Sequence, residues 1–243
     1  MWSHPPESLE VACGGVHVWR AALDVSPELL VRFSDHLAED ERSRAARFVF
    51  PRDRDRFIVA RSVLRDILGR YLVLHPADIR FSYGESGKPE LAPDLSGSRL
   101  RFNLAHSRDL ALYAFTLGRE VGIDVEFVRS ELAKEEIAER FFSEREAAEL
   151  RALPPSEQPA AFFRCWTRKE AYIKARGRGF RIPLASFDVS LGQPARLLAV
   201  RDDPAEAARW ILCDIPVGRD CQAALAIEGE NPEFFLLDWL SAT

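Results

Sequence analysis

The sequence predicts an α+β protein made of two similar halves. The order long helix, short strand, turn, two strands occurs in residues 51–117 and again in residues 159–227. Helices mixed with antiparallel hairpins are typical of α+β folds and not of doubly wound parallel sheets. The 243 residues, 47% of them hydrophobic and 29% charged, suffice for one large domain or two modest ones. We therefore expect two α+β halves, residues 1–118 and 119–243, that share element order and little sequence.

The first half is expected to place two helical stretches after an initial strand. Residues 15–25 alternate in the manner of a strand, and Ser26 with Pro27 opens a helical pattern that runs toward residue 48. Residues 51–72 carry the apolar stripe of a long helix. A short strand at 79–83, a turn at 84–89 and the strands "LRFNLAHS" and "LALYAFTLG" complete this half.

The second half is expected to repeat that order after the strand "EVGIDVEFV" and a helical region at 130–153. Residues 160–177 predict a strong helix that ends at Gly177. A hairpin at 187–200 that turns at Gly192, a helix or loop at 202–209 and the strands "RWILCDI" and "CQAALAIE" follow. Residues from 228 onward are expected to pack an apolar strand or helix against the body, without an assigned function.

Charge, hydropathy and cysteine content argue against several classes of protein. The net charge of −5 argues against a nucleic-acid binder, which usually carries a basic excess. No apolar run reaches the length of a membrane span, and the N-terminus lacks a secretion pattern. Four scattered cysteines predict reduced thiols and a cytoplasmic protein. The charge is uneven, because residues 42–70 are rich in arginine and residues 120–150 in acid, so a cationic pocket could lie beside an anionic one.

The stretch "GIDVE" places two carboxylates close together. Residues two apart share a face of a strand, so Asp124 and Glu126 are expected to project together. Their mutual repulsion requires a cation, a proton or full solvation. The plain alternative is a solvated strand end.

The stretch "WTRKEAYIKARGRG" places Glu170 and Lys174 one helical turn apart. The plain alternative is a surface ion pair that contributes about 0.3–0.5 kcal/mol. However, Trp166 lies four residues before Glu170 on the same face, and a carboxylate on a core-facing side needs a partner. Three carboxylates, two from a strand and one from a helix, suit Mg²⁺, and Lys174 would meet a phosphate as a point charge.

Taken together, these motifs resemble those of the 4′-phosphopantetheinyl transferases of the longer, surfactin-synthetase-activating type. The resemblance rests on "GIDVE", on "FFSEREAAEL" and on W-x-x-K-E-A-x-x-K-x-x-G-x-G at residues 166–179. "GKP" at 87–89 and "NLAHS" at 103–107 fit the same family. It implies a 4′-phosphopantetheinyl transferase fold in which two similar halves form a pseudodimer within one monomeric chain.

The resemblance also implies a set of catalytic and metal-binding residues. Asp124, Glu126 and Glu170 would hold Mg²⁺ against the pyrophosphate of coenzyme A. Lys174 would contact the phosphate under attack and assist the departing group. Glu146 matches a proposed general base for the hydroxyl of the carrier serine. Because Ser143-x-x-Glu146 is also a capping box, a purely structural role for Glu146 stays open.

Residues of the first half would bind coenzyme A. The resemblance assigns Lys88, His106 and Ser107 to its phosphates, and Arg56 to the region of the 3′-phosphate. Arg61, which does not share a helix face with Arg56, is kept as a weaker candidate. Lys88 in a solvated turn and a structural His106 are the plain alternatives.

The implied activity moves 4′-phosphopantetheine from coenzyme A to a serine of an apo acyl-, peptidyl- or polyketide carrier protein. The alternative is a Mg²⁺-dependent hydrolase or nucleotidyl transferase that acts on a soluble phosphate ester, and a non-catalytic scaffold is a third possibility. Carrier proteins of this kind are generally acidic, as is this chain. Docking must therefore rely on a local patch of arginines or exposed apolar residues.

Overall fold

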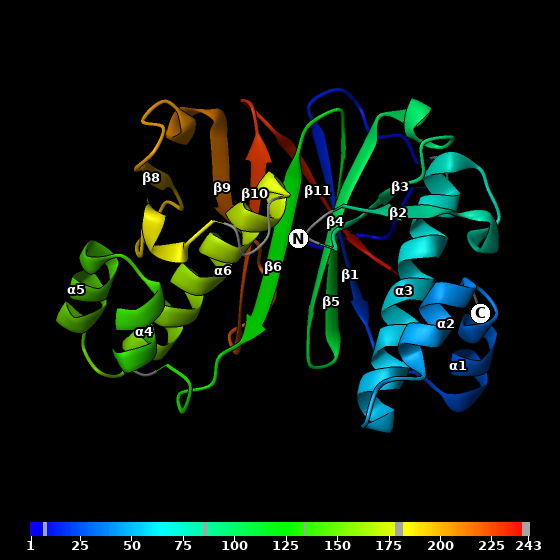
Figure 1. The fold of residues 1–243 in the computed structure, drawn as a ribbon, viewed down its shortest axis with the longest axis horizontal. Helices are drawn as coiled ribbons and strands as arrows, with labels where there is room; N and C mark the ends of the chain where they lie inside the picture. The colour runs from blue at the N-terminus through cyan, green and yellow to red at the C-terminus, as the bar shows by residue number, and fades with distance from the viewer. Residues whose placement is uncertain (7–8, 85–86, 134, 178–181, 240–243) are drawn as a thin grey trace.

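A computed structural model describes residues 1–6, 9–84, 87–133, 135–177 and 182–239. Two β-sheets lie between two groups of helices, with α1–α3 on one side and α4–α6 on the other (Figure 1). The helices are α1 (Pro27–Ser34), α2 (Glu39–Ala45), α3 (Pro51–Leu72), α4 (Glu135–Phe141), α5 (Glu144–Ala152) and α6 (Gln158–Arg176). The strands are β1 (Gly15–Ala22), β2 (Phe81–Tyr83), β3 (Pro89–Leu91), β4 (Leu100–Ser107), β5 (Leu110–Leu117), β6 (Val121–Phe127), β7 (Phe187–Val189), β8 (Leu197–Val200), β9 (Trp210–Asp214), β10 (Cys221–Glu228) and β11 (Glu233–Asp238).

The two halves repeat one topology. The first sheet has the order β11-β1-β5-β4 and the second has the order β6-β10-β9. β1, β5 and β4 therefore correspond to β6, β10 and β9, and all four pairings within these two triplets are antiparallel. A two-stranded ribbon accompanies each sheet, β2–β3 in the first half and β7–β8 in the second. The predicted α+β class with two similar halves is confirmed, while the boundary at residue 118 stays a prediction.

Three hydrophobic cores hold these layers together. One lies between α3 and the first sheet, another between α6 and the second sheet, and the third between the two sheets. Alternation along β1 shows the arrangement, because Trp19 packs in the core that contains α3 while Val16 and Val18 pack in the core between the sheets. Both faces of β1 are therefore buried, and the halves share a continuous apolar contact.

The long helix predicted at 51–72 is confirmed as α3, whereas the helical stretch predicted from Ser26 toward residue 48 is two helices. Ser26 caps α1 as expected, by accepting a hydrogen bond from the Leu29 amide. The chain then turns and buries Leu37 before α2 begins. The Glu41 carboxylate accepts the Ala38 amide at 3.0 Å and so stabilises the start of the second helix.

The end of the chain crosses to the other half. β11 pairs in parallel with β1 and so extends the sheet of the first half. The strand or helix expected after residue 228 is thus a strand, but it does not belong to the sheet of residues 119–243. In the described part of the chain, no helix is long and apolar enough to cross a membrane.

The contact between β6 and α6 depends on Gly122. A Cβ atom added there would lie 2.1 Å from the Ala171 carbonyl oxygen and 2.3 Å from the Ala175 nitrogen. Since real Cβ atoms do not approach backbone atoms this closely, only glycine lets the helix backbone rest directly on the strand. The first residue of "GIDVE" therefore sets the distance between its carboxylates and the helix that carries Glu170.

Gly122→Ala is expected to lower the free energy of unfolding by about 3 kcal/mol, because α6 must move away from β6. The same movement should separate Glu170 and Lys174 from Asp124 and slow catalysis. Urea unfolding measures the first effect. Gly97→Ala is the matched control, because nothing lies within 4 Å of a Cβ at that position. Equal stability of the two variants would contradict the close approach.

Candidate active site

The two sheets meet along β4 and β6, and side chains connect the strands there. The Asn103 Oδ1 atom accepts a hydrogen bond from the Ile123 amide at 2.9 Å, and the Ser107 Oγ atom accepts one from the Phe127 amide at 3.4 Å. Ser107 also donates to a Glu126 carboxylate oxygen at 2.8 Å. This seam brings the predicted phosphate-binding stretch of the first half beside the predicted metal-binding stretch of the second.

The three predicted metal-binding carboxylates influence one another, as their proposed role requires. Burial and the negative charge of Asp124 raise the pKa of Glu170, Lys174 opposes this shift, and Glu126 adds to it. Asp124 is 6% exposed. Burial raises its pKa to about 6 in spite of Lys174. The three carboxylates therefore interact electrostatically, and their role as metal ligands stays a prediction.

Lys174 holds the deepest of these carboxylates. Its Nζ atom donates to Asp124 Oδ1 at 2.7 Å and to the Ile123 carbonyl oxygen at 3.3 Å. The other oxygen, Asp124 Oδ2, is buried and has no hydrogen-bond partner among the described residues. A buried carboxylate oxygen without a partner is costly, so this atom offers a position for a cation.

The donor set fits a hard divalent cation such as Mg²⁺. All three candidates are carboxylates, the ligands such an ion prefers, and one of their oxygens is buried without a partner. As the side chains stand, no group of three or more Asp, Glu, His or Cys residues within the described ranges is arranged to hold a metal ion. Binding would therefore require Glu126 or Glu170, which are both partly exposed, to change rotamer.

Asp124→Asn is expected to stabilise the metal-free protein at pH 8 by about 3 kcal/mol. The folded-state pKa of Asp124, about 6, lies above the ordinary value of 3.8. The folded protein therefore keeps a proton that the unfolded chain has lost, and stability present below pH 4 is lost as the pH rises through 6. Asparagine cannot ionise, so it avoids this loss.

Urea unfolding in EDTA between pH 4 and pH 8 measures the effect. The advantage of the variant should vanish near pH 4. At pH 8, MgCl₂ in excess over the EDTA should reduce the stability difference between the two proteins, because it should stabilise only the wild-type protein. A difference between the two proteins that does not change with pH would contradict the raised pKa.

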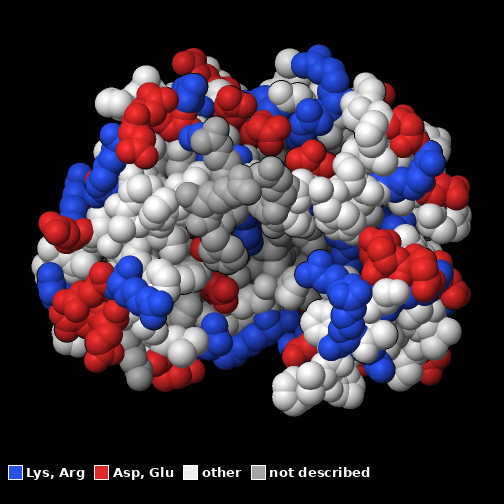
Figure 2. Space-filling view, in the orientation of Figure 1, with Lys and Arg blue, Asp and Glu red and all other residues white. Residues whose placement is uncertain are grey.

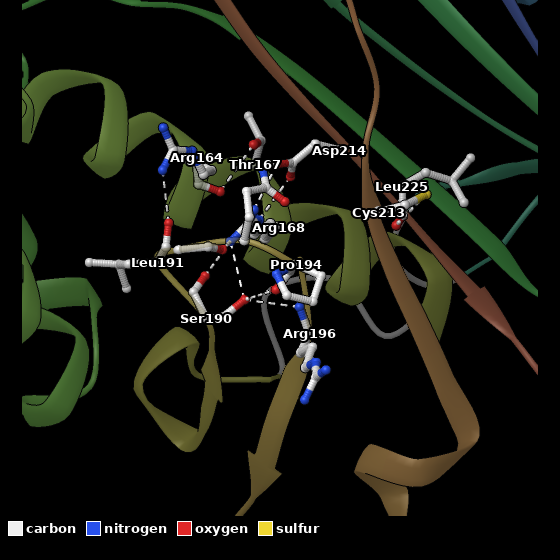
Figure 3. Close-up of polar contacts among 12 residues, drawn as sticks. Arg164, Thr167, Arg168, Ser190, Leu191, Pro194, Arg196, Cys213, Asp214 and Leu225 are labelled. Carbon is white, nitrogen blue, oxygen red and sulfur yellow. Dashed lines mark hydrogen bonds and ion pairs between the residues drawn. The ribbon is translucent and has the colours of Figure 1, made fainter.

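Two buried cations fix the orientation of α6. Arg168 donates to both oxygens of Asp214, at 2.8 and 2.7 Å, and to the carbonyl oxygens of Ser190 and Gly192, which ties the helix to β9 and the β7–β8 loop (Figure 3). Lys169 donates to the carbonyl oxygens of Leu184 and Phe187. With these side chains anchored, Glu170 and Lys174 are left facing β6.

The prediction from sequence missed this role of Arg168 and Lys169. A run of charges such as "TRKE" usually marks a solvated helix face. Here the helix carries large apolar residues both before and after the run, including Phe162, Phe163 and Ile173, so little of its surface remains for solvent. Large apolar residues on both sides of a charged run therefore indicate that some of its charges are buried.

Glu146 is buried in a structural network. One oxygen accepts the Ser143 amide at 2.9 Å and lies 2.7 Å from Lys169 Nζ, and the other accepts the Val189 amide at 2.7 Å. Ser143 completes the capping box. Glu146 has no exposed surface and no oxygen without a partner. The structure therefore supports the capping alternative and does not place Glu146 where it could accept the proton of a carrier serine.

Cationic side chains from both halves act on His106. The His106 residue is exposed at the surface, but partial desolvation lowers its pKa, as do the positive charges of Lys174, Arg44 and Arg56, while Asp53 opposes the shift. Arg56 is bound to Asp24 through two hydrogen bonds, at 2.8 and 2.9 Å. Since Asp24 is largely exposed, a phosphate could compete for this guanidinium. Lys174, Arg44 and Arg56 therefore all act electrostatically on His106, and the contacts of these residues with coenzyme A stay predictions.

Arg61 is not available to bind a ligand. Its guanidinium lies 2.5 Å from a Glu41 oxygen, donates to the Tyr83 hydroxyl at 3.1 Å and stacks on the Phe81 ring. Arg65 binds the other oxygen of Glu41. The weaker prediction that Arg61 contacts coenzyme A is corrected, because this buried network uses its donors to connect α2 and α3.

Lys88 lies at the other end of the seam from His106. Its Nζ atom donates to the Val121 carbonyl oxygen at 3.4 Å and lies 3.6 Å from a Glu120 oxygen. Burial lowers the pKa of Lys88, and Glu120 opposes this shift. The plain alternative, a solvated Lys88 in a turn, is wrong. The side chain is largely buried and binds the first residue of β6, the strand that carries Asp124.

Comparison with known proteins identifies the family. A model of the 4′-phosphopantetheinyl transferase superfamily matches residues 120–226, and a model of the N-terminal part of 4′-phosphopantetheinyl transferases matches residues 24–117. The 4′-phosphopantetheinyl transferase HetI of Nostoc sp. is 40% identical over 230 residues, which span 94% of each chain. The chain belongs to the 4′-phosphopantetheinyl transferase family. Sfp of Bacillus subtilis is 35% identical over 71% of this chain and 75% of its own length.

Membership of this family makes the chain an enzyme that transfers the 4′-phosphopantetheine arm of coenzyme A to a carrier protein. The two family models adjoin between residues 117 and 120, where the sequence predicts that the halves join. Holo-[acyl-carrier-protein] synthase of Thermotoga maritima aligns with 45% of this chain and 62% of its own at 22% identity. The TM-score of this alignment is 0.36.

Proposed function

We propose that coenzyme A binds at the seam of the two halves and that Asp124, Glu126 and Glu170 hold Mg²⁺ there. One observation carries the proposal. Asp124, Glu126 and Glu170 interact electrostatically at the seam, where Ser107 of β4 donates a hydrogen bond to Glu126 of β6 at 2.8 Å. The positive charges of Lys174, Arg44 and Arg56 act on His106, one residue before Ser107. Several negative phosphates need the cations, and carboxylates beside those phosphates need a metal ion between them.

The residues of the chain have distinct roles in this proposal. Bound Mg²⁺ would polarise the pyrophosphate and lower the repulsion between phosphate and carboxylate. Lys174, which neutralises Asp124 in the structure, would turn to the phosphate that is attacked. Ser107 would orient Glu126 through its 2.8 Å hydrogen bond, in addition to its proposed contact with coenzyme A.

The carrier serine must lose its hydroxyl proton during transfer. Glu170 is partly exposed at the seam, and its pKa is raised in the metal-free protein. Mg²⁺ on one of its oxygens would lower that pKa, so the proton would have to go to the oxygen that the ion does not hold. Since Glu146 is occupied elsewhere, we propose Glu170 as the carboxylate that accepts this proton.

His106→Ala is expected to weaken coenzyme A binding about tenfold, as the loss of one hydrogen bond to a charged phosphate predicts. Isothermal titration with coenzyme A measures the dissociation constant. His4→Ala, at an exposed position outside the seam, is the control. Unchanged titration curves for His106→Ala would remove this residue from the binding site.

The carrier proteins proposed as acceptors are apo acyl-, peptidyl- or polyketide carriers, and the enzyme is proposed to act as a cytoplasmic monomer. The decisive experiment incubates an apo carrier with coenzyme A, Mg²⁺ and the enzyme, followed by mass spectrometry. A gain of the 4′-phosphopantetheine mass on the carrier serine is expected, with release of adenosine 3′,5′-bisphosphate. Soluble hydrolysis products with an unmodified carrier would favour a Mg²⁺-dependent hydrolase instead.

A further inference from the structure

The connection between α2 and α3 exposes three consecutive large apolar residues. Phe48, Val49 and Phe50 are 38%, 85% and 67% exposed. The Phe48 ring rests on the Phe57 ring at a centroid distance of 5.3 Å, which ties this connection to α3. Contiguous exposed apolar residues in a soluble protein are typical of interaction sites.

Three arginines border this apolar run. Arg44 lies over the Phe57 ring at 5.2 Å, and Arg47 and Arg52 are exposed on either side of the run. Elsewhere in this region arginines are paired, for example Arg54 with Asp55 at 2.7 Å. Across the described ranges, no ion pair involves the three arginines that border the run. We call Arg44, Arg47, Phe48, Val49, Phe50 and Arg52 the α2–α3 surface.

The α2–α3 surface is continuous with the proposed active site. Arg44 acts on the His106 ring together with Arg56 and Lys174, and Arg56 follows Arg52 by one turn of α3. Figure 2 shows Lys and Arg side chains gathered beside the hollow between the two halves, on the side of α2 and α3. A partner bound here would therefore lie beside the site at which its serine must react.

We propose that the α2–α3 surface docks the acidic carrier protein. This inference rests on the proposed function and adds the surface and the chemistry of recognition. The chain is net acidic, so an acidic partner needs a local cationic surface to approach it. Acidic and basic side chains also lie on the α4–α5 side of the hollow (Figure 2), but there arginines are paired with glutamates, for example Arg151 with Glu135 and Glu139.

Two substitutions test the apolar part of this surface. Phe50→Ser and Val49→Ser are each expected to raise the KM for an apo carrier about tenfold, as expected for a central interface residue, and to leave the KM for coenzyme A and kcat unchanged. Phe50 is the N-cap residue of α3, where serine is favoured, so Phe50→Ser should fold as well as the wild-type enzyme. The probes are an apo acyl carrier protein and an apo peptidyl carrier domain.

Val73→Ser is the matched control for Val49→Ser. Both valines are highly exposed, 89% and 85%, but they flank opposite ends of the 22-residue helix α3, about 33 Å apart at 1.5 Å per residue. Val73→Ser should keep the wild-type KM for the carrier. Arg47→Glu should raise that KM at low salt, and the difference from wild type should shrink at high salt because ions screen the interaction.

The outcomes separate the docking surface from the activity itself. If the wild-type enzyme modifies carriers and both serine variants keep its KM for every carrier, the docking surface is wrong and the activity stands. A parallel rise in the KM for coenzyme A would assign the segment to the donor site and overturn the proposal, as would concentration-dependent self-association that Phe50→Ser abolishes. If the wild-type enzyme modifies no carrier, the proposed function fails first.

Discussion

Asp124→Asn and Glu170→Gln are each expected to reduce transfer by about 10²–10³-fold while the fold is kept. Each change keeps the shape of the side chain and removes one negative charge from the proposed metal site. Loss of one preorganised electrostatic contact to a transition state typically has an effect of this size. The rate at which an apo carrier gains mass gives the activity, and circular dichroism confirms folding.

Metal binding provides a second measurement that does not depend on turnover. Titration with MgCl₂ should show binding to the wild-type enzyme and weakened or absent binding to both variants. Glu149→Gln, which changes an exposed carboxylate paired with Arg145 on α5, should match the wild-type enzyme in both assays. Wild-type turnover by Asp124→Asn and Glu170→Gln would refute the assignment of the metal site.

Glu146→Gln is expected to lower the free energy of unfolding by about 3–5 kcal/mol. The change leaves the Lys169 ammonium, which is fully buried and 2.7 Å from Glu146, without its counter-charge, and breaking a buried pair has a cost of this order. The amide oxygen of glutamine can replace only part of the capping interactions with Ser143 and Val189. Urea unfolding at pH 7 measures the loss.

Adding Lys169→Met to the Glu146→Gln variant separates the contribution of the ion pair to stability from that of the helix cap. Removing the unpaired ammonium should restore part of the lost stability, so the two effects should not add. Below its melting temperature, Glu146→Gln should keep wild-type kcat and coenzyme A affinity. Slow transfer by a fully stable Glu146→Gln variant would instead restore this residue as the general base.

The elements with strong local patterns were predictable from sequence, and those set by distant contacts were not. The helical pattern of residues 51–72 matches α3, although the middle of that helix is buried on every side, without a break from Phe57 to Arg65. The break between α1 and α2 depends on the burial of Leu37 and on the Glu41 cap, which no local periodicity reveals. The pairing of β11 with β1 joins residues more than 200 positions apart, so its place in the fold could not be predicted.

The site shows the same division. Alternation on a strand was sufficient to place Asp124 and Glu126 on one face, and helix spacing placed Glu170 beside Lys174. The sequence does not reveal which charged side chains form buried ion pairs, because the partners of these pairs are distant in sequence. Arg61 forms a buried ion pair with Glu41, and Glu146 forms one with Lys169. Residue type and spacing therefore identified the candidate site residues, and their burial in the structure shows which of them are free to bind a ligand.

Because β11 pairs in parallel with β1, the chain cannot be cut between the two halves without separating two paired strands. A fragment cut at residue 118 would lose the outermost strand of its sheet and expose the backbone hydrogen-bonding groups of β1, an edge prone to aggregation. The second fragment would carry that strand with nothing to pair against. The final strand therefore joins the two halves, and we expect them to fold as one unit.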